Sequence, residues 1–180
     1  MNLDENDYVE FKALGSNETI SKSDQNIYQF AIDKKVNASG NIQSMLVEDG
    51  FKDKKDVPAW CYGFMFNNCT SLQTAPDLPA TILADWCYSY MFYSCSGLQI
   101  AHQLPATTLA SGCYYNMFMF CSSLQAAPDL PATTLASNCY GYMLAGCEKF
   151  DSVNMKKSME GVYSTSTHGD TTKTVNYVLD

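Results

Sequence analysis

The sequence predicts an α/β repeat protein in which each coil of the chain contains one short strand and one short helix. Two series of four cysteines recur with the same 26-residue period and lead to this fold class: Cys61, Cys87, Cys113 and Cys139, and Cys69, Cys95, Cys121 and Cys147. The text between them hardly changes, since CYSYMFYSCSGLQIAHQLPATTLAS at residues 87–111 is followed by CYYNMFMFCSSLQAAPDLPATTLAS at residues 113–137. A fixed period of this size is typical of stacked repeats, which expose long regular surfaces and bind ligands there.

Residues 1–50 do not repeat and are predicted to form a β-rich N-terminal cap. Residues 8–14 alternate in polarity before a turn at 15–17, and residues 27–32 are a second strand candidate. Residues 42–46 read as the tail of a degenerate first repeat, because Leu46 falls one full period before Leu72. The end of a repeat stack needs a polar cover, which this segment would supply.

Residues 51–159 are predicted to form an array of about four repeat units. In the segment Leu124–Leu130, Pro128 excludes a helix, so one short strand is expected in each unit. Residues 137–147 are expected to be helical, as are their equivalents. The basis is an apolar series spaced by four residues and an N-cap residue before each stretch: Leu109, Cys113, Met117 and Cys121, with Asp85, Ser111 and Ser137 as the caps.

Residues 160–180 close the array in this interpretation. They are rich in Thr, Tyr and Val around His168-Gly169-Asp170, which predicts a C-terminal β-hairpin.

The columns that stay constant between repeats are predicted to form the core. They are the Met column (Met65, Met91, Met117, Met143), the Phe column that ends in Leu144 (Phe66, Phe92, Phe118), and a Tyr column with its hydroxyls at the boundary (Tyr62, Tyr88, Tyr114, Tyr140). The Cys-x7-Cys spacing differs from the Cys-x2-4-Cys of zinc sites, and eight helical residues span about 12 Å, too far for a disulfide within one unit. Bridges between neighbouring coils stay open, but buried small thiols are favoured over a thiol or metal protein. No cofactor or metal is predicted.

The repeat text also resembles a known family. The series Met117-Phe118-x-x-Cys121-Ser-Ser-Leu124, followed by a Pro-bearing strand, resembles the BspA-like leucine-rich repeat proteins of host-associated bacteria and some protists. Leu130-Pro-Ala-Thr-Thr-Leu135 is similar to a 26-residue subtype in gut Bacteroides-type surface proteins, and residues 40–46 look like the segment before that array. The resemblance covers roughly residues 40–150. It implies a right-handed leucine-rich-repeat solenoid, extracellular or on the cell surface, that acts in adhesion and binds host proteins.

Charge and motifs exclude several function classes. The net charge is −8, residues 60–147 contain three Asp and no Lys, and the chain has no Arg, so nucleic acid is not an expected partner. No apolar run of about 18 residues exists to span a membrane. Residues 1–12 are acidic and lack the apolar stretch of a signal peptide, which leaves a protein kept inside the cell or a leader outside this sequence.

No catalytic motif is present either: the sequence has no G-x-S-x-G, no Gly-rich phosphate loop and no His-bearing metal motif. We therefore predict a non-enzymatic interaction module, a monomer or weakly self-associating, that binds a protein or a glycan. The alternative is a structural or assembly domain of a surface or phage-like fibre.

Candidate binding residues fall into two groups. Seven polar residues are expected to point outward from the strands: Gln73, Asp77, Gln99, His102, Gln103, Gln125 and Asp129. His102 stands where the other repeats have Pro. The second group varies between repeats and forms an uncharged patch if it lies outside the core: Tyr90, Tyr93, Met119 and Phe120. Exposed aromatic patches mark interfaces, whereas burial against the next coil is the alternative.

Overall fold

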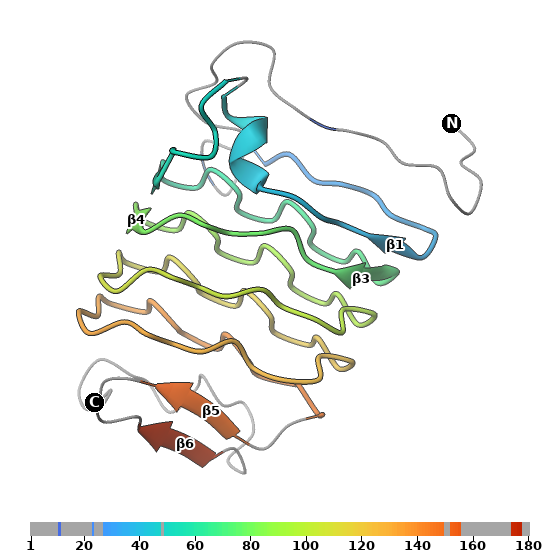
Figure 1. Ribbon diagram of the computed structural model, residues 1–180. Helices are drawn as coiled ribbons and strands as arrows, with labels where there is room; N and C mark the ends of the chain where they lie inside the picture. The colour runs from blue at the N-terminus through green and yellow to red at the C-terminus, as the bar shows by residue number, and fades with distance from the viewer. Residues whose placement is uncertain are drawn as a thin grey trace.

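The computed structural model describes residues 11, 23, 27–47, 49–149, 152–155 and 174–177. Figure 1 shows successive repeats lying one above the next as stacked coils, with the N-terminal segment at one end. The regular elements are β1 (Val36–Asn37), the 3-10 helix η1 (Ile42–Met45), β2 (Asp56–Val57), β3 (Leu72–Thr74), β4 (Ile82–Leu83), β5 (Ser152–Met155) and β6 (Thr174–Tyr177). Within the described residues, no helix has the length and apolarity needed to cross a membrane.

All three strand pairs are parallel, as coils that run in the same direction require. In the pair β2–β4, Asp56 lies opposite Ile82, an offset of one 26-residue repeat. Isolated bridges repeat the same offset elsewhere in the stack, joining Thr74 to Ile100 and Thr108 to Thr134. Neighbouring coils therefore meet at equivalent positions of the repeat.

The N-terminal segment stacks on the first full repeat in a register different from the predicted one. Val36 of β1 pairs with Leu72 of β3, an offset longer than one repeat, and the offset returns to one repeat at β2. The prediction that Leu46 is the equivalent of Leu72 is therefore wrong. The extra residues lie between Asn41 and Asp56 and include η1, and Leu46 follows η1 as a fully buried side chain.

Two further strands were predicted in the N-terminal cap, at residues 27–32 and 8–14. Residues 27–32 form no strand, although the Phe30 N–H donates to the Met65 carbonyl at 2.8 Å and so joins this segment to the first repeat. The candidate at residues 8–14 lies outside the described residues apart from Phe11.

The predicted helix in each coil is wrong. The stretches 60–69, 86–95, 112–121 and 138–147, which we call the turn face, consist of consecutive turns. Their backbone is left-handed at every fourth residue, for example Trp60 (φ 60°), Phe64 (φ 62°) and Asn68 (φ 58°). A right-handed helix cannot pass through such residues.

Two alternating sets of hydrogen bonds explain this backbone. One set closes the turns, since the Gly63 N–H donates to the Trp60 carbonyl at 2.9 Å and each second residue repeats the pattern. The other set joins the coils, since the Phe64 N–H donates to the Ser89 carbonyl at 3.0 Å. Every backbone donor of residues 60–69 finds a partner in this way, as buried backbone requires. An α-helix would satisfy its donors internally and lose the bonds to the next coil.

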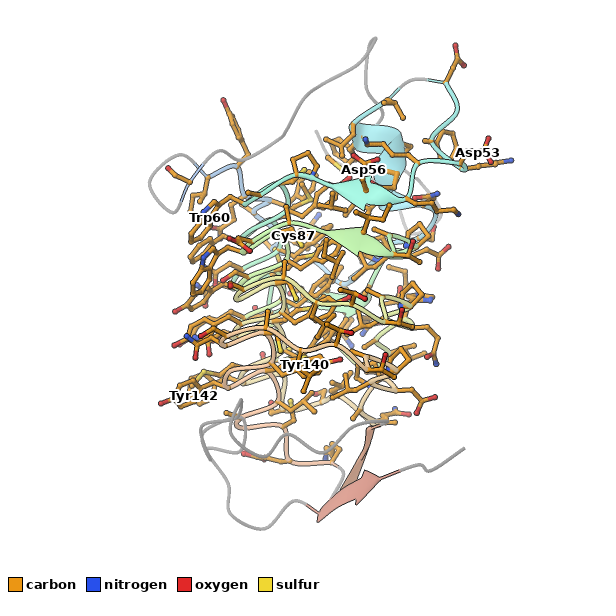
Figure 2. All side chains as sticks on the ribbon, turned by 90° about the vertical axis from the view of Figure 1, so that its left-hand side faces the viewer. Asp53, Asp56, Trp60, Cys87, Tyr140 and Tyr142 are labelled. Atoms are coloured by element: carbon orange, nitrogen blue, oxygen red, sulfur yellow. The ribbon has the colours of Figure 1, made fainter. Side chains whose placement is uncertain are left out.

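The opposite side of each coil, residues 72–83, 98–109 and 124–135, is called the strand face here. It contains β3 and β4, and β3 occupies the start of the strand predicted for the first unit. The two faces enclose a single core, and Figure 2 shows Cys87 and Tyr140 inside the stack.

The core is built from ladders of identical side chains, as predicted. The Met and Phe columns are at most 6% exposed. Phe30, Phe66, Phe92 and Phe118 stack with ring centroids 5.1–5.4 Å apart. The Tyr column stacks at 5.6–5.9 Å. Its hydroxyls were expected at the boundary, which is wrong for Tyr88 and Tyr140, since both hydroxyls are buried without a hydrogen-bond partner among the described residues.

The eight cysteines are buried thiols. The cysteines of the series that begins at Cys69 also form hydrogen bonds. Their thiols donate to carbonyls of the preceding coil: Cys95 to Phe66 at 2.9 Å, Cys121 to Phe92 at 3.1 Å and Cys147 to Phe118 at 3.2 Å. A buried carbonyl thereby gains a donor of a size that fits the ladder.

At the C-terminal end, β5 and β6 pair in parallel, with Ser152 opposite Thr174. The hairpin predicted in this region falls mainly on residues outside the described part. The described residues of β6 pair with β5 instead, at an offset slightly shorter than one repeat.

Candidate functional site

The left-handed positions of the turn face form three columns, and many of their side chains are aromatic. The columns are Trp60, Trp86, Gly112 and Asn138; Phe64, Tyr90, Asn116 and Tyr142; and Asn68, Ser94, Phe120 and Gly146. Six of these twelve residues carry large aromatic side chains. None of the six is among the buried core residues, so these rings lie outside the core.

Aromatic residues are poor choices for this backbone. The left-handed conformation costs a residue with a Cβ about 1–2 kcal/mol, and Gly or Asn adopts it most readily. The repeat itself contains Gly112, Asn116 and Asn138 at equivalent positions, so local structure does not demand an aromatic ring. Strained residues that the fold does not require suggest a function for their side chains.

Contacts between rings offset part of this cost. Trp60 stacks on Trp86 at 5.5 Å, and Phe64 stacks on Tyr90 at 4.6 Å. Such pairs contribute about 0.5–1.5 kcal/mol beyond burial. We call the resulting surface the aromatic face, which comprises Trp60, Phe64, Trp86, Tyr90, Tyr93, Tyr115, Phe120 and Tyr142. Figure 2 shows Trp60 and Tyr142 along one edge of the molecule, with Asp53 along the opposite edge.

A groove of about 520 Å³ runs along the aromatic face. Its lining consists of six aromatic residues and one amide: Trp60, Phe64, Trp86, Tyr90, Tyr115, Asn138 and Tyr142. The Trp column stops at Gly112, so no third indole follows Trp86. The groove therefore opens where a smaller residue replaces a ring.

Glycines of the next coil make room for these rings. A Cβ on Gly112 would overlap the six-membered ring of Trp86, and a Cβ on Gly141 would lie 2.6 Å from Cδ2 of Tyr115. Tyr115 meets Trp86, Tyr90 and Tyr142 edge-on, at 5.6, 5.7 and 6.0 Å. The rings are thus held by one another and by the backbone below them.

The residues that line the groove carry no charge near pH 7. Burial, followed by the proximity of Tyr90 and Tyr142, raises the pKa of Tyr115 above its ordinary value of 10.0. The phenol therefore stays neutral near pH 7. No lining residue is acidic or basic.

The structure brings together part of the predicted aromatic patch. Tyr93 lies between Tyr90, at 5.6 Å, and Phe120, at 5.7 Å. Phe120 is 45% exposed, and Met119 is half-buried. Of the four predicted patch residues, Phe120 is exposed and the other three, Tyr90, Tyr93 and Met119, are half-buried, so neither alternative holds for the whole patch.

The predicted polar residues lie on the strand face, across the core from the aromatic face. Gln73, Gln99 and Gln125 form one column, joined by backbone bonds of 2.9 and 3.1 Å. His102 Nδ1 lies 3.1 Å from Asp77 Oδ1, and both side chains are substantially exposed. Gln103 and Asp129 are exposed as well. The predicted set therefore spans two separate surfaces.

The column Phe64, Tyr90, Asn116 and Tyr142 could be identified from the sequence as variable and therefore as a candidate for function, whereas Trp60, Trp86 and Tyr115 were missed as members of the site. A signal was available for the two tryptophans, because positions 60, 64 and 68 and their equivalents are spaced by four and the residue at each of them varies between repeats. Treating the stretch as a helix hid this spacing, since a period of 3.6 distributes the same residues over several directions.

No family model, curated protein or solved structure matches this chain. The resemblance to BspA-like repeat proteins stays a prediction. Within the described ranges, no group of three or more His, Cys, Asp or Glu could hold a metal ion.

Proposed function

We propose that the chain is a non-enzymatic interaction module that binds a protein or glycan ligand through its aromatic face. One observation carries this proposal: six aromatic side chains occupy left-handed backbone positions where the repeat elsewhere has Gly or Asn. Outward rings held at a cost in stability are explained by a ligand that contacts them. Large aromatic residues are also the side chains that dominate binding energy at interfaces.

The rigidity of the surface supports the same conclusion. Alternate N–H groups of the turn face pair with the next coil, and the rings pack on glycines beneath them. A surface that is ordered before binding loses less entropy when the ligand arrives.

The leucine-rich-repeat class and a location outside the cell belong to this proposal. The inward Leu residues and the parallel stacking of 26-residue units support the class, although turns replace the helix of each coil. The location rests on the resemblance of the repeat text to surface proteins.

Binding to immobilised probes tests the proposal. We would measure the wild-type chain on an array of oligosaccharides, mucin and extracellular-matrix proteins. The test variant is Trp60→Asn with Tyr90→Asn and Tyr142→Asn, which copies residues found in the same columns at Asn138 and Asn116. We expect at least a tenfold loss of affinity for any probe that the wild type binds.

A strand-face variant is the matched control. His102→Pro with Gln103→Asp copies the neighbouring repeats and is expected to retain binding. Loss of binding in this variant, with retention in the aromatic variant, would contradict the proposal.

The second candidate is a structural or assembly element, because the aromatic face extends over all the described repeats and could pack against another copy. Light scattering separates the two. If the wild type is a stable oligomer and the aromatic variant is a monomer, assembly is favoured. If both are monomers, ligand binding is favoured.

A further inference from the structure

The groove on the aromatic face has a volume typical of a small-molecule site. Its volume of about 520 Å³ lies within the roughly 300–1,000 Å³ typical of small-molecule sites. Six of its seven lining residues are aromatic, and the seventh is Asn138. Aromatic rings therefore make up most of the lining, and its polar groups include tyrosine hydroxyls and one amide.

The rings form walls of two orientations. Trp60 and Trp86 are nearly parallel, with 12° between their planes, as are Phe64 and Tyr90 at 6°. Tyr115 stands at 72° to Trp86. A cation is attracted to an aromatic face within about 6 Å of the ring centroid. Each stacked pair covers one face of each of its rings, so a cation would lie against the faces that stay free, and Tyr115 adds a second orientation beside Trp86.

The charge around the groove favours a cation. Residues 56–148 contain no Lys or Arg, so no basic side chain of this stretch competes for the rings, and the whole chain carries a net charge of −8. Asp85 directly precedes Trp86, and its exposed carboxylate is oriented by the Ser111 N–H, which donates to Oδ1 at 3.0 Å.

The chemistry of the lining narrows the kind of cation. A primary ammonium or a guanidinium carries N–H donors that need acceptors, and the lining offers them only neutral tyrosine hydroxyls and the amide oxygen of Asn138, with no carboxylate. A quaternary ammonium has no N–H, so aromatic walls can replace its water. We propose that this groove binds a quaternary ammonium group of the choline type. This inference rests on the proposed function of the aromatic face and names the chemistry of the ligand.

Intrinsic fluorescence measures the binding directly, because both tryptophans of the chain line the groove. Choline chloride is titrated at constant ionic strength set with NaCl. The matched ligand is 3,3-dimethylbutan-1-ol, which has the shape of choline with carbon in place of nitrogen and no charge. We expect a saturable change with choline and at least tenfold weaker binding of the neutral compound.

Two variants locate the site. Tyr142→Asn removes a lining ring, copies Asn116 of the same column and is expected to weaken choline binding at least fivefold. His102→Pro with Gln103→Asp lies on the strand face, copies the neighbouring repeats and is expected to bind choline like the wild type. Circular dichroism of both variants checks that they are folded.

Two results would overturn the inference: equal affinity for choline and its neutral analogue, which means a merely apolar groove, or no saturable response to choline in the folded wild type. If choline fails but the aromatic variant still loses binding to the immobilised probes, the interaction module stands without this ligand. If choline binds, sedimentation with phosphatidylcholine and phosphatidylglycerol vesicles identifies its source. Selective binding to phosphatidylcholine supports a lipid headgroup, and binding to neither supports a soluble choline ligand.

Discussion

The turn face and the strand face belong to the same coils but are held together differently. Between the second and third repeats, five turn-face N–H groups, from Trp86 to Ser94, donate to the next coil at 2.8–3.0 Å. The strand face contains only strands of two or three residues and isolated bridges in the described repeats. It presents polar side chains such as Gln99, whereas the turn face presents rings. The face with the more regular hydrogen bonds thus carries the aromatic residues in left-handed conformation, because a dense ladder of hydrogen bonds can hold residues in conformations that are locally unfavourable.

Alkaline pH should have the largest effect on the free energy of unfolding, because all eight buried cysteines lie on the turn face. Burial raises the pKa of Cys95 to about 12, and it raises the pKa values of Cys87 and Cys121 well above the usual 9.0. Unfolded thiols ionise near pH 9, so stability is fully present below that pH and is lost as the pH rises toward the folded values. The loss is about 1.4 kcal/mol per pH unit for each deeply buried thiol.

Guanidinium unfolding between pH 7 and pH 11 measures this loss. Cys95→Ala should make the pH dependence shallower, even though it lowers stability at pH 7. A midpoint that stays constant up to pH 11 would show that the thiols are not buried as described.

Gly112→Ala should be the next largest change. The residue is left-handed at φ 58°, and a Cβ would overlap Trp86, so we expect a loss of about 2 kcal/mol in the free energy of unfolding and a shift in tryptophan fluorescence. Gly63→Ser is the control, since Ser89 occupies the same column and Gly63 is not left-handed. Equal effects of the two substitutions would mean that the ring does not lie on Gly112.

Two neighbouring members of the tyrosine ladder, Tyr62 at its end and Tyr88 inside it, provide a finer comparison. The Tyr62 hydroxyl donates to Gln43 Oε1 at 2.8 Å, so Tyr62→Phe leaves a buried acceptor without its donor and should cost about 1–2 kcal/mol. The Tyr88 hydroxyl is buried without a partner among the described residues, so Tyr88→Phe should be neutral or stabilising by about 1 kcal/mol. Thermal unfolding of both variants checks the difference, and the reverse order would contradict it.

The smallest effect is expected on the strand face. His102→Pro with Gln103→Asp breaks the contact between His102 and Asp77, but exposed pairs of this kind contribute little. The free energy of unfolding should change by no more than about 0.5 kcal/mol. A loss in chemical denaturation as large as that expected for Gly112→Ala would mean that the strand face is as tightly determined as the turn face.

Part of the site could be predicted from the sequence, and part could not. Comparing the four copies separates constant from variable columns, which is how Tyr90, Tyr93 and Phe120 were found. Trp60 and Trp86 were missed because their column contains two different replacements, Gly112 and Asn138, and looks irregular. The binding role of the polar group around Gln99 stays a prediction, because nothing in the alternation of a strand tells which side of the coil would carry a ligand.

The sequence by itself determined the 26-residue period and the buried Cys, Met, Phe and Tyr columns, because only apolar side chains of equal size can stack in register through every coil. Whether each stretch between them is a helix or a series of turns was decided by tertiary structure. Inward residues spaced by four suit both conformations locally. The turns prevail because alternate N–H groups find partners on the next coil, and that partner exists only when the coils are stacked. The same choice turns Trp60, Tyr90 and Tyr142 outward and creates the aromatic face.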